Sequence, residues 1–83
     1  MKYQKKNTKI LVEAQVVTEE AGWDLEAWCQ GKFTAFSGVA YLDVPTVNGI
    51  VRAYPDDYLV QDALGKFTVV DKQTFEADYE VTT

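Results

Sequence analysis

Two adjacent carboxylates, Asp56 and Asp57, stand in the stretch AYPDDY, directly before the apolar run YLV. Paired carboxylates can move protons if their environments separate the two pKa values, and they can also hold a cation. Neighbouring residues of an extended segment point to opposite faces, which hinders joint action on one atom. Pro55 fixes φ, and an Asp side chain in a turn accepts a hydrogen bond from the N–H two residues on. We therefore favour a turn, with cation binding and catalysis as the alternatives.

Other candidates for catalysis are few, because the chain has no histidine and a single cysteine, Cys29. No Ser–His or Cys–His pair can form, no disulfide can close within the chain, and a zinc site built on histidine or on several thiolates is excluded. We interpret Cys29 as a buried apolar residue, since a nucleophilic thiol usually needs a basic activator. We expect no enzyme activity, no metal and no cofactor. A small enzyme that uses carboxylates, lysine or tyrosine is the alternative.

Charge is distributed unevenly along the 83 residues. Eight basic and 13 acidic residues give a net charge of −5. Four lysines lie within the first nine positions: Lys2, Lys5, Lys6 and Lys9. From residue 10 onward, four basic residues stand against 13 acidic ones, a balance of −9. An acidic body repels nucleic-acid phosphates and suits a partner with a basic surface, although solubility alone is a simpler explanation.

The basic residues 1–8 are predicted to form a flexible arm, because chain ends are usually poorly ordered. In the alternative, the lysines contact phosphates and Tyr3 stacks on a base. The arm is basic like the start of a signal peptide, but the apolar run after it is short and contains Glu13. No run approaches the roughly 20 residues of a membrane span. We expect a soluble cytoplasmic protein that does not bind membranes.

The first elements are predicted from composition and capping signals. Lys9 to Val17 is rich in valine and isoleucine, which is typical of a strand. A short helix is predicted over Asp24 to Gln30, with Thr18 or Asp24 as its N-cap. Gly31 is the expected C′ glycine that ends this helix.

Two tryptophans belong to this helical region. Trp28 shares a face with Leu25 and Cys29, at spacings of three and four residues, so we expect it in the core. Trp23 is expected to pack the helix on the sheet. Alternatively, it is an exposed anchor for a partner, because tryptophan is enriched in binding hot spots.

The second half of the chain is typical of short strands joined by turns. Asn48-Gly49 predicts a tight turn, because both residues tolerate positive φ, and Leu64-Gly65 predicts a second hairpin. Pro45 indicates that its strand ends near Val44 or runs along an edge.

A final helix, KQTFEADY, is predicted to begin after the N-cap Asp71 and to align Phe75 with Tyr79. The tail YEVT is expected to add a short strand. The order β-α-β-β-β-β-α, with this last strand, indicates an α+β fold. We predict one small, mostly antiparallel β-sheet with one covering helix and a short C-terminal helix. Residues 1–83 are predicted to form a single domain.

Three stretches of the chain follow a recognisable pattern: MKYQKKNTKILVEAQVV, VPTVNGIVRAYPDDYLV and GKFTVVDKQTFEADYE. They resemble the segments M-K-Y-R-K-K-P-V-x-I-E-A, I-P-T-x-x-G-x-x-x-A-x-P-G-D-Y-I-I and G-E-F-Y-P-C-K-P-D-I-F-E-x-T-Y-E of small phage and prophage proteins of the PGDYG type. Asp56 stands where that family has glycine, and Val70 stands where it has cysteine. The resemblance implies a phage origin, and therefore the cytoplasm of a bacterial host. It also implies a compact fold, but no activity.

The leading hypothesis is a phage accessory protein that binds a host protein without catalysis. An inhibitor of a host defence complex, such as an anti-CRISPR, is one concrete form, because CRISPR effectors hold nucleic acid in positively charged channels. The alternative is a self-associating accessory protein, a homodimer formed through free strand edges. Direct nucleic acid binding is disfavoured. The candidate binding residues are Trp23, Asp56, Asp57, Asp62 and Glu76.

Overall fold

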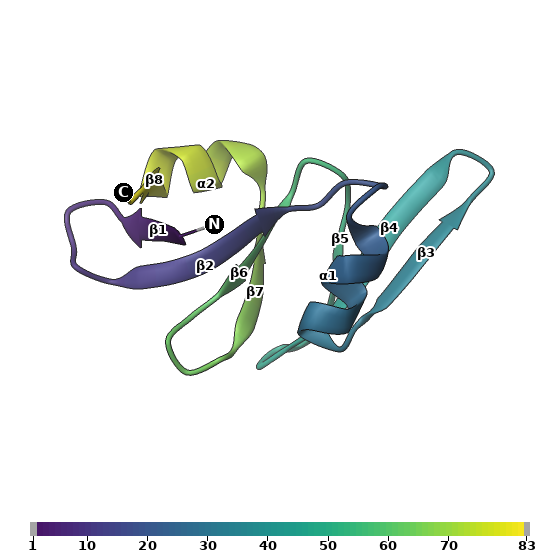
Figure 1. Ribbon diagram of the computed structural model, residues 1–83, viewed down its shortest axis with the longest axis horizontal. Helices are drawn as coiled ribbons and strands as arrows, with labels where there is room; N and C mark the ends of the chain where they lie inside the picture. The colour runs from purple at the N-terminus through teal and green to yellow at the C-terminus, as the bar shows by residue number, and fades with distance from the viewer. Residues whose placement is uncertain (1, 83) are drawn as a thin grey trace.

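The computed structural model describes residues 2–82, which form two antiparallel sheets and two helices (Figure 1). The five-stranded sheet, in the order β7-β6-β2-β1-β8, contains β1 (Lys2–Lys5), β2 (Leu11–Val16), β6 (Tyr58–Gln61), β7 (Phe67–Val70) and β8 (Tyr79–Val81). The three-stranded sheet, in the order β3-β4-β5, contains β3 (Lys32–Phe36), β4 (Val39–Thr46) and β5 (Gly49–Ala53). The helices are α1 (Gly22–Cys29) and α2 (Lys72–Asp78). The α+β class and its antiparallel character are confirmed, but the strands form two sheets where the sequence predicted one.

The five-stranded sheet is buried on both faces at strand β6. Leu59 and Val60 are adjacent in β6 and therefore point to opposite faces, yet both are buried, with 0% and 3% exposure. On one face Val60 joins Val12, Ala14 and Phe75 of α2 in a small core. On the other face Leu59 joins the core beneath α1 and the three-stranded sheet. β6 thus connects the two halves of the molecule seen in Figure 1.

α1 covers the inner face of the three-stranded sheet. Leu25 and Cys29 of the helix are each 4% exposed. They share a core with Phe33, Leu42, Val44 and Ala53 of the sheet. Trp28 is half-buried and packs edge-on against Phe67 of β7, with ring centroids 4.9 Å apart. The predicted inward face of this helix is confirmed.

The predicted flexible arm is wrong for Lys2–Lys5, which form strand β1 inside the five-stranded sheet. β1 pairs with β2 on one side and with β8 on the other, so that Tyr3 lies opposite both Val12 and Val81. Tyr3 also packs edge-on against Phe75, with ring centroids 4.7 Å apart. A ring that is used in this way is not free to stack on a nucleic-acid base.

Both ends of α1 differ from their prediction. The N-cap is Ala21, while the Thr18 hydroxyl accepts a hydrogen bond from the Ala21 N–H at 3.0 Å in the turn before the helix. At the other end, Gln30 takes the left-handed conformation, with φ of 57°. Gly31 is therefore not the left-handed residue. A Cβ at Gly31 would lie 2.2 Å from the backbone oxygen of Asp43, so glycine is needed here for close approach to β4.

Pro45 is the second-last residue of β4, so the strand ends two residues after Val44, close to its predicted end, whereas the alternative of an edge strand is wrong because β4 is central in its sheet. β3 pairs only with residues 39–43 of β4, and Pro45 extends beyond the end of β3. Its missing N–H therefore costs no ladder bond on that side. Of the two predicted turns, the one at Gly65 is confirmed with φ of 83°. The tight turn between β4 and β5 is present as well, with Thr46 opposite Gly49, but its central residues are Val47 and Asn48, and Asn48 does not take positive φ.

Asp71 caps α2 as predicted, and its carboxylate accepts the Thr74 N–H at 3.2 Å. Hydrogen bonds from the Thr74 side chain and then its backbone hold the pKa of Asp71 below its usual value. A lowered folded pKa stabilises the protein above the unfolded pKa of about 3.9, and this contribution is lost as pH falls through the folded pKa.

We expect Asp71→Asn, which keeps an N-cap acceptor but removes the charge, to lower the melting temperature at pH 6 by about 2 °C. The melting temperatures of the two proteins should converge as pH falls through 4 to 2.5. Calorimetry over this range tests the expectation, and a difference that is independent of pH would contradict it.

Candidate protein-binding surface

Asp56 and Asp57 belong to a tight turn between β5 and β6. The Asp57 N–H donates to the Tyr54 carbonyl at 3.0 Å, which makes Pro55 and Asp56 the central residues. Asp56 has φ of 81°, as the second central position of a type II turn requires. The Asp57 carboxylate accepts the Tyr54 N–H at 2.9 Å, three residues back rather than two residues on. The turn interpretation is confirmed.

This turn is fixed to the chain that leaves β2. The Asp56 N–H donates to the Val17 carbonyl at 2.9 Å, and the Val17 N–H donates to the Asp57 carbonyl at 2.7 Å. Val17 itself is fully buried in the core beneath α1. The two aspartates therefore belong to a turn that is hydrogen-bonded to the end of β2, and the Asp57 carboxylate already accepts a hydrogen bond within that turn.

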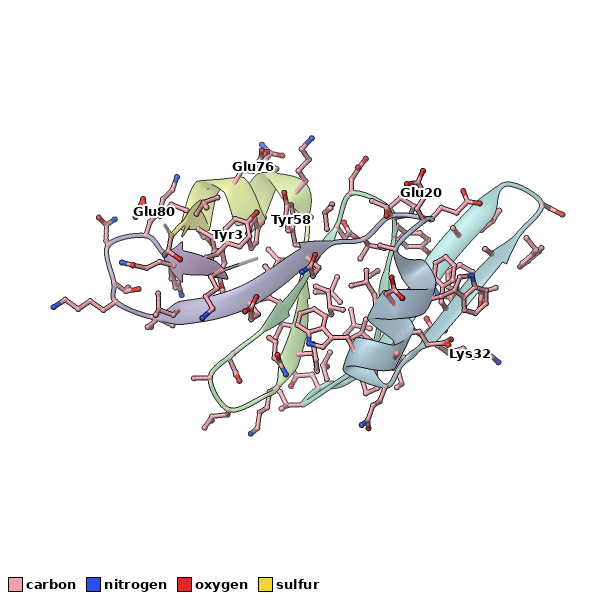
Figure 2. The ribbon with its side chains drawn as sticks, viewed as in Figure 1. Tyr3, Glu20, Lys32, Tyr58, Glu76 and Glu80 are labelled. Carbon is pink, nitrogen blue, oxygen red and sulfur yellow. The ribbon has the colours of Figure 1, made fainter. Side chains whose placement is uncertain are left out.

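The other candidate residues lie apart from this turn. Asp62 follows the opposite end of β6, and its carboxylate accepts the N–H groups of Leu64 and Lys66 at 2.9 and 3.0 Å, which stabilises the β6–β7 turn. Glu76 is exposed on α2 (Figure 2). Trp23 is 61% exposed on α1. The structure does not bring the five predicted residues together on one surface.

Acidic side chains instead concentrate around α1. Residues 10–31 contain five carboxylates and no lysine or arginine: Glu13, Glu19, Glu20, Asp24 and Glu26. They lie on β2, on the turn before α1 and on α1 itself; Figure 2 shows Glu20 beside the start of the helix. Glu13 lies opposite Lys2 of β1, so the negative potential comes mainly from the four carboxylates on α1 and the turn before it.

An open cleft of about 580 Å³ lies between α1 and the five-stranded sheet. Glu13 and Gln15 of β2 and Gln61 of β6 line its sheet side, and Glu13 and Gln61 are register partners. Asp24 and Trp28 belong to the helix side. The full lining is Glu13, Gln15, Ala21, Asp24, Leu25, Trp28 and Gln61.

The chemistry of this acidic cleft suits a cationic side chain. The Asp24 carboxylate on the helix side attracts an ammonium or guanidinium group, and carboxylates bind guanidinium in bidentate geometry. Indole is the best aromatic surface for a cation. The amides of Gln15 and Gln61 can accept further hydrogen bonds.

A second groove, of about 490 Å³, runs along α2 and is lined by aromatic rings. Figure 2 shows Tyr3 and Tyr58 there, with Glu76 and Glu80 nearby. Tyr58 stacks on Phe75 with centroids 3.9 Å apart and an interplanar angle of 8°. Burial, and then the neighbouring Tyr58, raise the pKa of Tyr3, so its hydroxyl stays protonated near neutral pH. These rings mainly complete the core around α2.

Cys29 is buried, and this burial raises the pKa of its thiol, in keeping with its interpretation as an apolar residue. Within residues 2–82, no group of three or more cysteine or carboxylate side chains is arranged to hold a metal ion. Over the same range, neither helix has the length and apolar character that crossing a bilayer requires.

No protein-family model, curated protein or solved structure matches this chain. The resemblance to PGDYG phage proteins therefore stays a prediction, and so does every function attached to it.

The sequence analysis missed the cleft residues Glu13, Gln15, Asp24 and Gln61 as a group. Their available signal was the absence of lysine and arginine between residues 10 and 31. Summing charge over the whole region after residue 9 hid this local run. The contribution of Gln61 required the pairing of β2 with β6, which no local pattern indicates.

Proposed function

We propose that this chain is a non-catalytic binding protein that docks the acidic surface around α1 onto a protein with a basic surface. The observation that carries the proposal is the acidic cleft, with Asp24 and Trp28 on its helix side and the amides of Gln15 and Gln61 on its sheet side. A basic loop or helix of the partner would insert a lysine or arginine side chain there. Complementary charge would speed encounter and align the two surfaces.

Trp23 lies on the other side of α1 from this cleft, beside β3, and is not part of the cleft lining. It is 61% exposed on the same helix and packs edge-on against Phe33, with ring centroids 5.0 Å apart. A large ring held in place by a neighbour loses little entropy when a partner covers it, which is typical of a hot-spot residue. Charge recognition in the proposed complex therefore depends on the acidic cleft, and the exposed Trp23 ring belongs to a separate part of the surface.

We further propose that the protein acts in a phage-infected bacterial cell. The target there is a host defence complex that holds nucleic acid in a positively charged channel, and the protein acts as an inhibitor of the anti-CRISPR kind. The sequence resemblance supports the phage origin. The acidic surface supports the target chemistry, because carboxylates can occupy a channel built for phosphates.

The test is capture of a binding partner from a bacterial lysate by the immobilised protein and by two charge-reversal variants. The first carries Glu20→Lys and Asp24→Lys at α1. The second carries the same number of reversals far from the cleft, Asp78→Lys and Glu80→Lys. We expect the first variant to bind the captured partner about 10- to 100-fold more weakly, and the second to bind like wild type. Raising the salt concentration should weaken wild-type binding.

Circular dichroism of both variants controls for loss of fold. If the two variants bind equally well, or if salt has no effect on binding, the α1 surface is not the docking site. A captured partner without a basic surface would also contradict the proposal. Asp57 and Asp62 are unsuitable for charge reversal, because both hold turns.

A further inference from the structure

Strand β3 has an open edge. Among residues 2–82 it pairs only with β4. The two strands are joined by a Ser37–Gly38 turn with φ of 49° and 78°, which closes on Phe36 opposite Val39. Hydrogen-bonded pairs alternate from such a turn, so Thr34 and Phe36 bond to β4 while Phe33 and Ala35 direct their N–H and C=O groups outward.

One hydrogen bond agrees with this assignment. The Phe33 N–H donates to the Glu26 carboxylate of α1 at 2.7 Å. Glu26 therefore occupies one outward donor of the edge, while no hydrogen bond within residues 2–82 uses the Ala35 N–H or C=O. The other outer strands are less open, because β5 and β7 pack against each other and β8 has three residues.

Two large aromatic side chains stand exposed on opposite sides of this edge. Phe36 is 61% exposed on the outer face of the three-stranded sheet. Trp23, equally exposed, packs against Phe33 on the inner face. An unpaired strand flanked by exposed aromatic rings is typical of a site that another strand covers.

We propose that β3 pairs with β3 of a second copy of this chain, antiparallel and around a two-fold axis at Ala35. Each Ala35 N–H donates to the Ala35 carbonyl of the other copy, and Thr34 of each copy lies opposite Phe36 of the other. The ladder is short, because Glu26 holds the Phe33 N–H and Ser37 lies in the turn, so the two Ala35 bonds are its centre. Two three-stranded sheets thereby become one sheet of six strands.

The distribution of charge favours a second copy of this chain as the partner of the β3 edge. Each chain carries a net charge of −5, so most faces of two copies repel each other. Residues 33–42, which form most of the β3–β4 hairpin, contain no charged side chain. This hairpin is where two acidic copies can approach with the least repulsion, and it leaves the acidic cleft on the other side of α1 accessible. The inference is independent of the proposed function.

Sedimentation velocity between about 5 and 500 µM tests the dimer. We expect a monomer–dimer equilibrium with a Kd of tens of micromolar. Ala35→Pro removes the central N–H, yet it is tolerated in a monomer because that N–H faces solvent. We expect it to raise the Kd at least 10-fold, and Phe36→Lys to do the same. Ile50→Lys, a matched change at a 68% exposed site on β5, should leave the Kd unchanged.

A cysteine at the axis tests the register. Two residues directly opposite each other in a hydrogen-bonded antiparallel pair have Cα atoms about 5.5 Å apart, which is compatible with a disulfide. Ala35→Cys should therefore give a covalent dimer under mild oxidation, and Ile50→Cys should not. A wild-type protein that stays monomeric at 500 µM overturns the inference. Equal dimerisation of wild type and Phe36→Lys also overturns it, even if Ala35→Pro fails to fold.

Discussion

Phe75→Ala is expected to lower the melting temperature by about 20 °C. Phe75 is 2% exposed and is the only large side chain that α2 buries. Truncating a buried phenylalanine costs about 3–5 kcal/mol, since the surrounding atoms cannot fill the cavity. For a domain of this size, each kcal/mol lowers the melting temperature by about 4–8 °C.

Three tyrosine rings depend on the same side chain. Tyr58 and Tyr79 each stack on the Phe75 ring, with centroids 3.9 and 4.8 Å from it, and Tyr3 packs against it edge-on. Their contacts with Phe75 are lost together in the variant, so β1 and α2 should loosen with the core. Thermal denaturation followed by circular dichroism measures the effect.

Phe36→Ala is the matched control, because it makes the same chemical change at a 61% exposed ring. At low micromolar concentration it should change the melting temperature by less than about 3 °C. Equal losses for the two variants would mean that α2 is not packed on the five-stranded sheet as described.

Gly31→Ala is expected to cost about 2–3 kcal/mol, or roughly 10–15 °C in melting temperature. The added Cβ would lie 2.2 Å from the Asp43 backbone oxygen and 3.0 Å from the Cys29 sulfur. The backbone atom cannot rotate away as a side chain could. Relief therefore requires the end of α1 to move off β4, which opens the core around Cys29.

The neighbouring position gives a control of opposite sign. Gln30 has φ of 57°, a conformation that is strained for a residue with a Cβ, so Gln30→Gly should raise the melting temperature by about 3–5 °C. If Gly31 were the left-handed terminator that the sequence suggested, Gln30→Gly would be destabilising instead. Chemical denaturation of the two variants separates these accounts.

Features with a complete local signal were predictable from the sequence. Asp71 was recognised as an N-cap, because its carboxylate and the N–H that it binds lie within one helical turn. The turn at Pro55 and the one at Gly65 were recognised for the same reason. The short strand Tyr79–Val81 lies within the tail YEVT, which was expected to add a strand.

Features that depend on pairing between distant segments were not predictable. β1 is rich in lysine and carries no strand signal, and it is held by β2 and by β8 from the opposite end of the described chain. The role of Gly31 depends on how closely α1 approaches Asp43. The acidic cleft likewise combines Glu13, Asp24 and Gln61 from three elements. The composition of the chain indicated an acidic surface, but it did not indicate where on the fold this surface lies.

The central claim is that the acidic surface around α1 is the binding surface. The most direct measurement is a ¹H–¹⁵N correlation spectrum of the labelled protein, titrated with a hexa-arginine peptide at low salt and again with hexa-glutamate. We predict that hexa-arginine shifts the amides of residues 13–28 and the indole N–H of Trp28, and that hexa-glutamate shifts none of them. Shifts concentrated at Glu76 and Glu80, or no shift at millimolar hexa-arginine, would contradict the account.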